Sequence, residues 1–147
     1  MPEQKQSPDI SIVLETSFKP DDIHVVEQGL ENFNRRFAPD ECLLPLNIFL
    51  RRGDGTVFGG LLGNTYWGWL HIRILWIDDT LRGQGYGSRL VRLAEEEAIR
   101  RGCHHAHLDT MSFQAQPFYE KLGYSVFGCL NNLPENHKRI FLQKSLR

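Results

Sequence analysis

The glycine-rich stretch over residues 70–87 constrains the fold of this chain more than any other feature. It opens with apolar, β-branched and aromatic residues, passes the polar cluster Asp78-Asp79-Thr80, and ends with glycines at positions 83, 85 and 87. Apolar residues then recur at helical spacing. The order is therefore strand, glycine-rich turn and helix. Because a helix begins with unpaired N–H groups and glycines let an anion approach them, this stretch predicts a phosphate-binding site.

Three phosphate-binding patterns, and a turn without any ligand, compete as explanations of this stretch. A Walker loop needs a Lys after its last glycine, and no Lys stands near these glycines. A dinucleotide fingerprint needs glycine where Ser88 stands, and too little chain remains for its further strand–helix units, although Asp109 has about the spacing of a ribose-binding acid. A turn without a ligand would carry three flexible glycines without benefit. The pattern R-x-x-G-x-G, formed by Arg82, Gly85 and Gly87, is favoured over these alternatives.

This pattern resembles the acetyl-CoA signature of the GNAT acyltransferase superfamily, with Ile77 at the position of a Val-like residue five before the arginine. Residues 115–124, AQPFYEKLGY, resemble the superfamily's A-x-x-F-Y-E-K-L-G-[FY] helix. The two motifs stand in the family's order, and the resemblance covers residues 70–125 closely and the whole chain in outline. One position departs from it. Ser112 stands where many members carry an Asn that contacts the pantetheine arm, and a serine has a shorter reach.

The composition is that of an ordinary globular protein. The 147 residues are 41% hydrophobic and 24% charged, which predicts one domain over residues 1–147, with residues 1–9 as a loose tail. A net charge of -1 gives no support for a nucleic acid or an acidic membrane as partner. Three widely spaced cysteines form neither a disulfide framework nor a zinc pattern, and no signal peptide or membrane-spanning run is present. A reduced, cytoplasmic protein without a metal is expected.

The hydrophobic periodicity predicts an alternation of strands and helices in the order β-α-β-β-β-α-β-α-β-β. Gly53-Asp54-Gly55 predicts a hairpin between the second and third strands, and the Gly59-Gly60 pair predicts a bulge or a close backbone approach. This order implies an α/β mixed sheet of about seven strands with helices on both faces. The resemblance further implies a mostly antiparallel sheet that is splayed at its central parallel pair. Strands are expected at 10–18, 43–52, 57–65, 70–77, 104–110, 124–130 and 139–146, and helices at 20–37, from the glycine turn to 101, and at 114–122.

The resemblance implies transfer of an acetyl group from acetyl-CoA to an amine. It places the pyrophosphate on the N–H groups of residues 83–88, and the pantetheine arm in a gap between the strands that end near Ile77 and Thr110. The residues expected to bind acetyl-CoA are Leu75, Trp76, Ile77, Arg82, Gly83, Gln84, Gly85, Tyr86, Gly87, Ser88, Ser112 and Phe118.

The reaction needs a proton donor for the departing thiolate. Tyr119 stands at the family's usual donor position. A phenol with a pKa of about 10 is neutral at pH 7 and so is able to donate. The alternative is that Tyr119 only packs beside Phe118.

The amine must also lose a proton, because an alkylammonium has a pKa near ~10 and is no nucleophile. His71 is one candidate base: it lies six residues before Ile77, which predicts that both point to one face. It resembles one of the two strand histidines of arylalkylamine N-acetyltransferases, with Arg73 at the second position. A histidine that is merely hydrogen-bonded inside the sheet is the alternative explanation. A chain of water molecules, Glu41, His107 and Asp109 are the other candidate bases.

The acceptor pocket of this family is built from the first helix and from loops at the splayed end of the sheet. Aromatics and an acid, which suit a small, partly apolar amine, are supplied here by those regions: Asn34, Phe37, Glu41, Tyr66, Trp67 and Trp69. The tryptophans are equally compatible with a core or with the interface of a homodimer. The leading prediction is an N-acetyltransferase of small primary amines. A protein or peptide amine as acceptor, and a non-catalytic acyl-CoA sensor, are the alternatives.

Overall fold

The computed structural model describes residues 9–147, which fall into two units. Residues 9–39 belong to the first unit and Asp40–Arg147 form the second, and each is described by itself. The expected loose tail lies almost wholly outside the described residues, and a single domain over the whole chain stays a prediction.

The first unit contains one helix, α1 (Pro20–Asn34). Pro20 in its first turn and the acidic pair Asp21 and Asp22 suit a helix start, as expected. The strand expected over residues 10–18 is wrong, since these residues form no strand with any described part of the chain. Alternation of apolar residues gives a segment a β-compatible pattern, but a strand also requires a neighbour to pair with its backbone groups.

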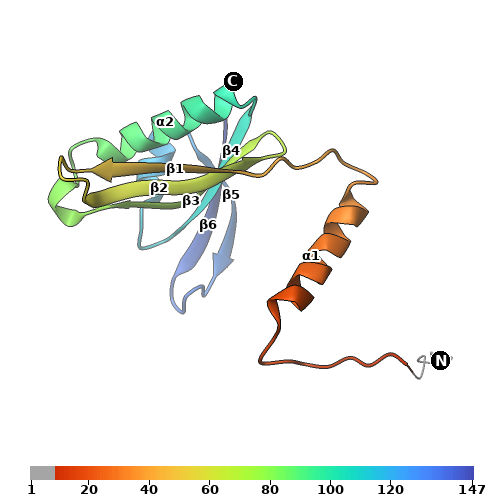
Figure 1. Cartoon of the computed structure of the whole chain (residues 1–147). Coiled ribbons are helices and arrows are strands. Elements are labelled where there is room, and N and C mark those ends of the chain that lie inside the picture. Colours follow the sequence, from red (N-terminus) through yellow and green to blue (C-terminus); the bar gives the residue numbers. More distant parts are fainter. Residues whose placement is uncertain (1–8) are drawn as a thin grey trace. The chain divides into compact units, whose positions relative to one another are not determined.

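The second unit is built on one mixed sheet (Figure 1). In the described chain the sheet has six strands in the order β1-β2-β3-β4-β6-β5, where about seven were expected. Only β3 and β4 are parallel, so the predicted mostly antiparallel sheet with a central parallel pair is confirmed. The strands are β1 (Leu44–Arg51), β2 (Val57–Tyr66), β3 (Trp69–Ile77), β4 (His105–Met111), β5 (Ser125–Asn131) and β6 (Lys138–Ser145).

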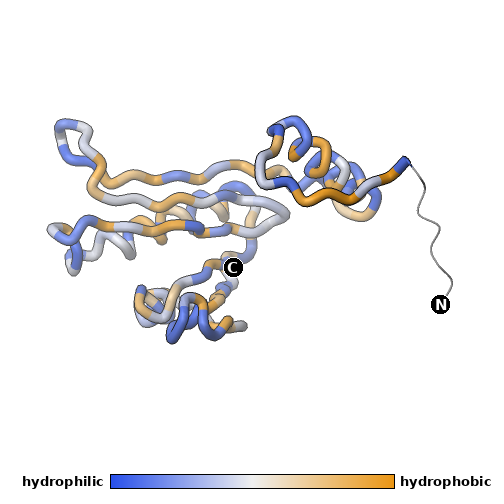
Figure 2. Tube along the Cα trace, turned by 90° about the horizontal axis from the view of Figure 1, so that it is seen from below, coloured by the Kyte–Doolittle hydropathy of each residue, from blue (hydrophilic) through white to orange (hydrophobic). Residues whose placement is uncertain are grey.

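Two helices and one 3₁₀ turn connect these strands. The turn η1 (Asp79–Leu81) and the helix α2 (Tyr86–Arg100) make the crossover from β3 to β4, and the short helix α3 (Gln116–Lys121) follows β4. The chain therefore runs strand, glycine turn and helix over the stretch for which the sequence predicts this order. Hydrophobic stretches interrupted by hydrophilic residues run along the strands of the sheet (Figure 2), and on β2 every second residue from Gly59 to Thr65 is buried.

Glycines on β2 let neighbouring strands approach closely. A Cβ atom on Gly59 would lie 2.7 Å from the backbone oxygen of Trp76, and one on Gly60 would lie 2.7 Å from that of Ile48. The close approach predicted for this pair is confirmed. The hairpin at residues 53–55 is confirmed as well, because β1 and β2 pair across it.

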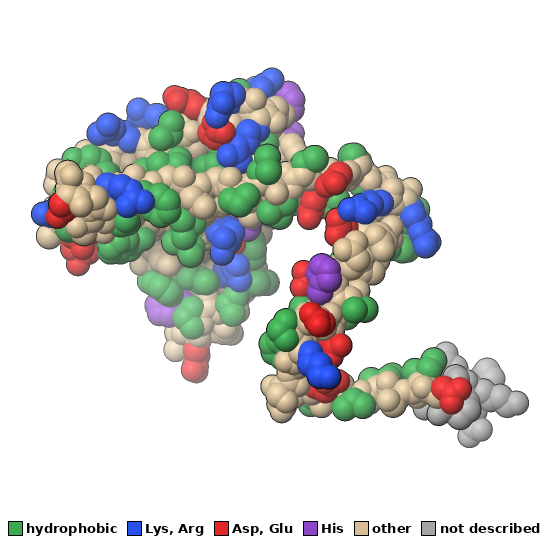
Figure 3. Space-filling model, in the orientation of Figure 1, with side chains coloured by type: hydrophobic (Ala, Val, Ile, Leu, Met, Phe, Trp, Pro, Cys, Tyr) green, Lys and Arg blue, Asp and Glu red, His purple; other side chains and the backbone are tan. Residues whose placement is uncertain are grey.

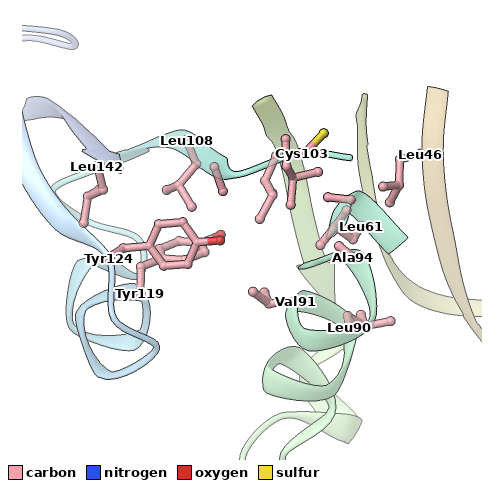
Figure 4. Packing of buried hydrophobic residues seen from close by; sticks show 14 of the residues in the cluster. Leu46, Leu61, Leu90, Val91, Ala94, Cys103, Leu108, Tyr119, Tyr124 and Leu142 are labelled. Carbon is pink, nitrogen blue, oxygen red and sulfur yellow. The ribbon is translucent and has the colours of Figure 1, made fainter. Parts of the chain in front are cut away.

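The core lies between the sheet and one side of α2. Leu90, Val91, Ala94 and Ala98 are buried there, and Tyr119 of α3 joins the same cluster (Figure 4). Charged side chains, both basic and acidic, cover the outer side of α2 (Figure 3). Since α2 and α3 share one cluster with the sheet, they cover the same face of it within this unit, and helices on both faces stay a prediction.

Candidate active site

The two parallel strands part halfway along their length, and a cavity opens where they do. β3 and β4 pair only from Trp69–His105 to Ile72–Leu108. The next residue of β3, Arg73, is the extra residue of a β-bulge. The neighbouring β2 residues Gly63 and Leu62 pair with Ile72 and Ile74, which leaves Arg73 without a partner in this register. A bulge bends its strand and increases the local twist, which accounts for the end of the pairing at this point. The cavity has a volume of about 850 Å³. The splay implied by the resemblance is thus present.

The bulge also reverses which side chains of β3 face the core. Ile72 is buried in the core before the bulge, and Leu75 and Ile77 pack against the core after it. His71 points to the other face, where its ring stacks on that of His107. The expectation that His71 and Ile77 share one face is therefore wrong. Side chains of a strand alternate between its two faces, and the extra residue of the bulge exchanges the faces for all residues after it.

The glycine turn leaves backbone N–H groups available to an anion at the start of α2. Gly83 and Gly85 have φ values of 73° and 84°, in the left-handed region that glycine adopts without strain. Gly85 is the N-cap residue of α2, and within the described chain no side chain caps this helix. Its first N–H groups therefore keep their hydrogen-bonding capacity, and they stand at the positive end of a 15-residue helix. These features fit the diphosphate of a coenzyme A molecule.

Side chains around the turn hold its backbone in place. The Nε atom of Arg82 donates to the carbonyl oxygen of Ile77 over 2.9 Å, and its Nη1 atom pairs with Oδ1 of Asp79 over 3.1 Å. Asp78 accepts a hydrogen bond from the backbone N–H of Thr80. A Cβ atom on Gly87 would lie 3.2 Å from Cζ of Phe118, so this glycine lets the aromatic ring close over the helix start. Here the signature arginine ties the end of β3 to the turn.

Tyr119 lines the cavity from the core side. Its side chain is only 6% exposed, with edge-on ring contacts to Phe118 and Tyr124. Burial, and secondarily the charge of Asp109, raise the pKa of Tyr119 to about 12. The phenol is therefore neutral throughout the physiological range and able to donate a proton. The hydroxyl of Tyr124 is also buried, and it has no hydrogen-bond partner in the described chain.

The structure places most of the predicted coenzyme-binding residues around this cavity. Those that line it are Leu75, Trp76, Ile77, Arg82, Gly83, Gly85, Tyr86, Gly87, Ser88 and Phe118. Gln84 and Ser112 are outside the lining. The Oγ atom of Ser112 accepts a hydrogen bond from the backbone N–H of Lys138 over 3.0 Å. Their roles in binding stay predictions.

Thr110 and Gln114 also line the cavity, and neither was among the coenzyme-binding residues expected from the sequence. The Oε1 atom of Gln114 accepts from the backbone N–H of Met111 over 2.7 Å, which holds this side chain between β4 and α3. Its position directly before the A-x-x-F-Y motif was the available signal.

Asp109 is the single carboxylate among the described residues that line the cavity. Its Oδ1 atom pairs with Nε of Arg139 over 2.9 Å, and the two side chains are 24% and 38% exposed. The hydrogen bond and the charge of Asp109 raise the pKa of Arg139. Asp109 therefore lines the cavity as half of an ion pair, and Arg73 and Arg82 line the same cavity.

The predicted acceptor residues of the second unit gather on the face of the sheet away from α2. The Trp69 ring stands edge-on to that of His107 with centroids 5.7 Å apart, and the Tyr66 and Trp67 centroids are 6.3 Å apart. The backbone oxygen of Glu41 accepts from the N–H of Trp67 over 2.9 Å. His71, Glu41, Trp67 and Trp69 are outside the lining of the cavity. Asn34 belongs to α1 in the first unit.

The comparisons with known proteins identify the family. The acetyltransferase (GNAT) family matches residues 13–124 of this chain. The chain is a GNAT acetyltransferase. Enzymes of this family use acetyl-CoA as the acetyl donor, which fits the turn and cavity described above.

Two curated relatives and one solved structure are similar to this acetyltransferase. An acetyltransferase of Agrobacterium fabrum is 41% identical over 99 residues, which cover 67% of this chain and 72% of the relative. The blasticidin-S acetyltransferase of Streptomyces morookaense is 39% identical over 93 residues, or 63% and 68% of the two chains. A crystal structure of an Agrobacterium tumefaciens protein, described as an acetyltransferase, superposes with a TM-score of 0.86 at 33% identity, covering 92% of this chain and 99% of that one. In the part of the chain that the structure describes, no helix is long and apolar enough to cross a membrane.

Proposed function

We propose that this enzyme transfers the acetyl group of acetyl-CoA to a primary amine of a small molecule, by direct attack of the amine in a ternary complex. One observation carries the proposal: a single cavity connects the uncapped start of α2 with the buried phenol of Tyr119 through the gap between β3 and β4. Such a cavity has an anion-binding end and a proton donor. The similarity to a blasticidin-S acetyltransferase supports a small molecule as acceptor.

The glycine turn and the gap would hold the coenzyme. The N–H groups of residues 83–88 suit a diphosphate, and the apolar side chains of Leu75, Ile77 and Phe118 suit the pantetheine arm. Gln84 and Ser112 are proposed as further contacts. Bound there, acetyl-CoA supplies an activated acetyl group as a thioester.

Tyr119 is proposed as the proton donor to the departing thiolate. The apolar surroundings that raise the pKa of the phenol also raise the pKa of a thiol that forms beside it, so the two groups remain matched. Burial protects the donor from bulk water. In this low-dielectric site its hydrogen bond to the developing charge is stronger than it would be in water.

His71 is proposed as the base that takes a proton from the amine. Burial is the main cause that lowers its pKa, so the imidazole is neutral at pH 7 and able to accept a proton. Glu41, Trp67 and Trp69 of the second unit are proposed to surround the acceptor, and the role of Asn34, on α1 of the first unit, stays a prediction. Aromatic side chains together with the carboxylate of Glu41 favour a small, partly apolar amine.

We place the enzyme in the cytoplasm, because its three cysteines are unpaired and Cys103 is buried as a thiol. We treat residues 1–147 as one acetyltransferase domain. The homodimer that the sequence analysis allows stays a prediction. A measurement of the molar mass in solution will test it.

The test is an assay of thiol release from acetyl-CoA with a panel of small primary amines, blasticidin S among them. Reactions without an amine serve as the control. The proposal expects release that depends on the amine, together with an acetylated amine detected by mass spectrometry. Tight binding of acetyl-CoA without release for any amine would instead support a non-catalytic acyl-CoA sensor. Acetylation of an added peptide, but of no small amine, would move the acceptor class to proteins.

A further inference from the structure

Two histidines from the parallel strands form a pair on the face of the sheet away from α2. The register sets His71 of β3 directly beside His107 of β4. Their rings are stacked, with centroids 4.4 Å apart and planes inclined by only 7°. Both side chains are half-buried. Two imidazoles at this separation disfavour a charge on both, so near neutral pH the pair holds at most one proton.

Groups from two neighbouring strands fix the ring of His107. The hydroxyl of Tyr66, at the end of β2, lies 2.8 Å from Nε2 of His107. Trp69 stands edge-on to the same ring. Burial and the charge of Glu41 raise the pKa of Tyr66, so its phenol keeps the proton that it is able to donate. With Nε2 as the acceptor, the proton of His107 lies on Nδ1.

His71 is the member of the pair that stays available. Neither of its ring nitrogens makes a hydrogen bond to another described residue, whereas His107 is bound to Tyr66. Asn64, the register neighbour of His71 on β2, has a buried Oδ1 atom without a hydrogen-bond partner in the described chain. A buried acceptor without a partner is costly, and an N–H group of a ligand beside His71 would satisfy it.

The pair lies at the edge of the cavity. Its strands separate after the Ile72–Leu108 pair, and Arg73 and Asp109, two residues beyond the histidines, line the cavity. The charges that act on the pair come from several elements: Asp109 favours a protonated imidazole, and Arg73 and Arg139 oppose one. Glu41 acts on Tyr66.

We propose that His71 and His107 act as one proton-accepting unit for the acceptor amine, in which His71 contacts the amine and His107 is a positioning residue oriented by Tyr66. The inference rests on the proposed function and deepens it. The sequence named the two histidines as separate candidate bases, but only the register and the stacking join them into one unit.

The proton balance of the reaction is simple. An ammonium substrate loses two protons from its nitrogen while the new C–N bond forms and the C–S bond breaks. His71 takes the first proton and passes it to solvent. Tyr119 gives its proton to the thiolate, and the second nitrogen proton restores the phenol. The products are the acetamide and the free thiol of coenzyme A.

The test compares His71→Gln and His107→Gln in single-turnover acetyl transfer as a function of pH. His71→Gln is expected to slow transfer by roughly 10²–10⁴-fold. His107→Gln should slow it less and move the acidic limb of the profile up toward about 6.5, because the ring that shields His71 from water is lost. His104→Gln is the matched control, since the His104 side chain is exposed and, among the described residues, its ring lies near that of His105 alone. It should leave the rate and the pH profile unchanged.

A nuclear magnetic resonance titration of the imidazoles gives a second readout without turnover. In the wild-type protein both pair members should titrate below the ordinary histidine value, and in His71→Gln the pKa of His107 should rise because the neighbouring charge is gone. Full activity of His71→Gln, or an acidic limb that does not move in His107→Gln, would overturn this inference alone. No thiol release by the wild-type enzyme with any amine would overturn the proposed function and this inference together.

Discussion

Replacing Tyr119 by phenylalanine removes one oxygen atom from the cavity wall and almost no volume. The hydroxyl makes no hydrogen bond to another described residue, and the ring contacts with Phe118 and Tyr124 remain possible for a phenylalanine. Because Tyr119 lines the cavity and its hydroxyl has no partner to leave unpaired in the described chain, the free energy of unfolding should change by no more than about 1 kcal/mol. A positioned acid is worth roughly 10²–10⁴-fold in rate, which corresponds to about 2.7–5.4 kcal/mol in the activation barrier.

The assay is single-turnover acetyl transfer at saturating acetyl-CoA, followed by thiol release, with coenzyme affinity measured by calorimetry. Because the pKa of Tyr119 is raised to about 12, the wild-type rate should show no loss from ionisation of this phenol below pH of about 10. The pH profile of the variant should keep the shape of the wild-type profile at a lower level.

The matched control is Tyr124→Phe, which removes the same atom from a neighbouring buried tyrosine. Its hydroxyl has no partner in the described chain, so its loss should leave the rate unchanged and the stability equal or higher, by up to about 1–3 kcal/mol. A Tyr119→Phe variant that turns over at the wild-type rate, with chemistry rate-limiting, would show that Tyr119 only packs in the core.

Two further predictions concern stability. Gly63→Ala should lower the free energy of unfolding by about 1–3 kcal/mol or more, measured by urea denaturation, because its Cβ atom would lie 2.3 Å from the backbone oxygen of His71 at the bulge; an unchanged midpoint would refute the tight register described here. The wild-type protein should lose stability as the pH falls below about 6.5, because burial lowers the pKa of His71 and of His107 and the unfolded chain then binds more protons; in His107→Gln this slope should be shallower, and an identical slope would contradict the cause.

Local sequence patterns were sufficient for the elements that hold the coenzyme. The turn around Gly85 and the helix after it follow from glycine spacing and helical periodicity, which are properties of neighbouring residues. The same holds for the hairpin at residues 53–55. Residues 10–18 show the limit of this approach, since their alternation is that of a strand but no described segment pairs with them.

The features that shape the site are set by contacts between distant segments. The bulge at Arg73 decides which side chains of β3 face the core, and it depends on how β2 pairs with β3. No residue type marks it in the sequence. The stacking of His71 on His107 likewise depends on the parallel register of strands separated by a whole helix. Residue types in the sequence therefore indicated which side chains take part in acid–base chemistry. Which of these side chains lie together became known only from the structure.

The most direct test of the central claim is the affinity of coenzyme A for a variant of the glycine turn. Gly85→Glu places a negative side chain at the N-cap of α2, and Gly102→Glu is the matched control at the other end of the same helix. Both glycines have positive φ values, 84° and 90°, with open space around a Cβ atom, so both substitutions cost about 1–2 kcal/mol of backbone strain.

Calorimetric titration should show wild-type affinity for Gly102→Glu and no measurable binding for Gly85→Glu, with circular dichroism confirming that both variants are folded. Wild-type affinity in a folded Gly85→Glu variant would contradict the placement of the coenzyme diphosphate at this helix start, and with it the proposed active site.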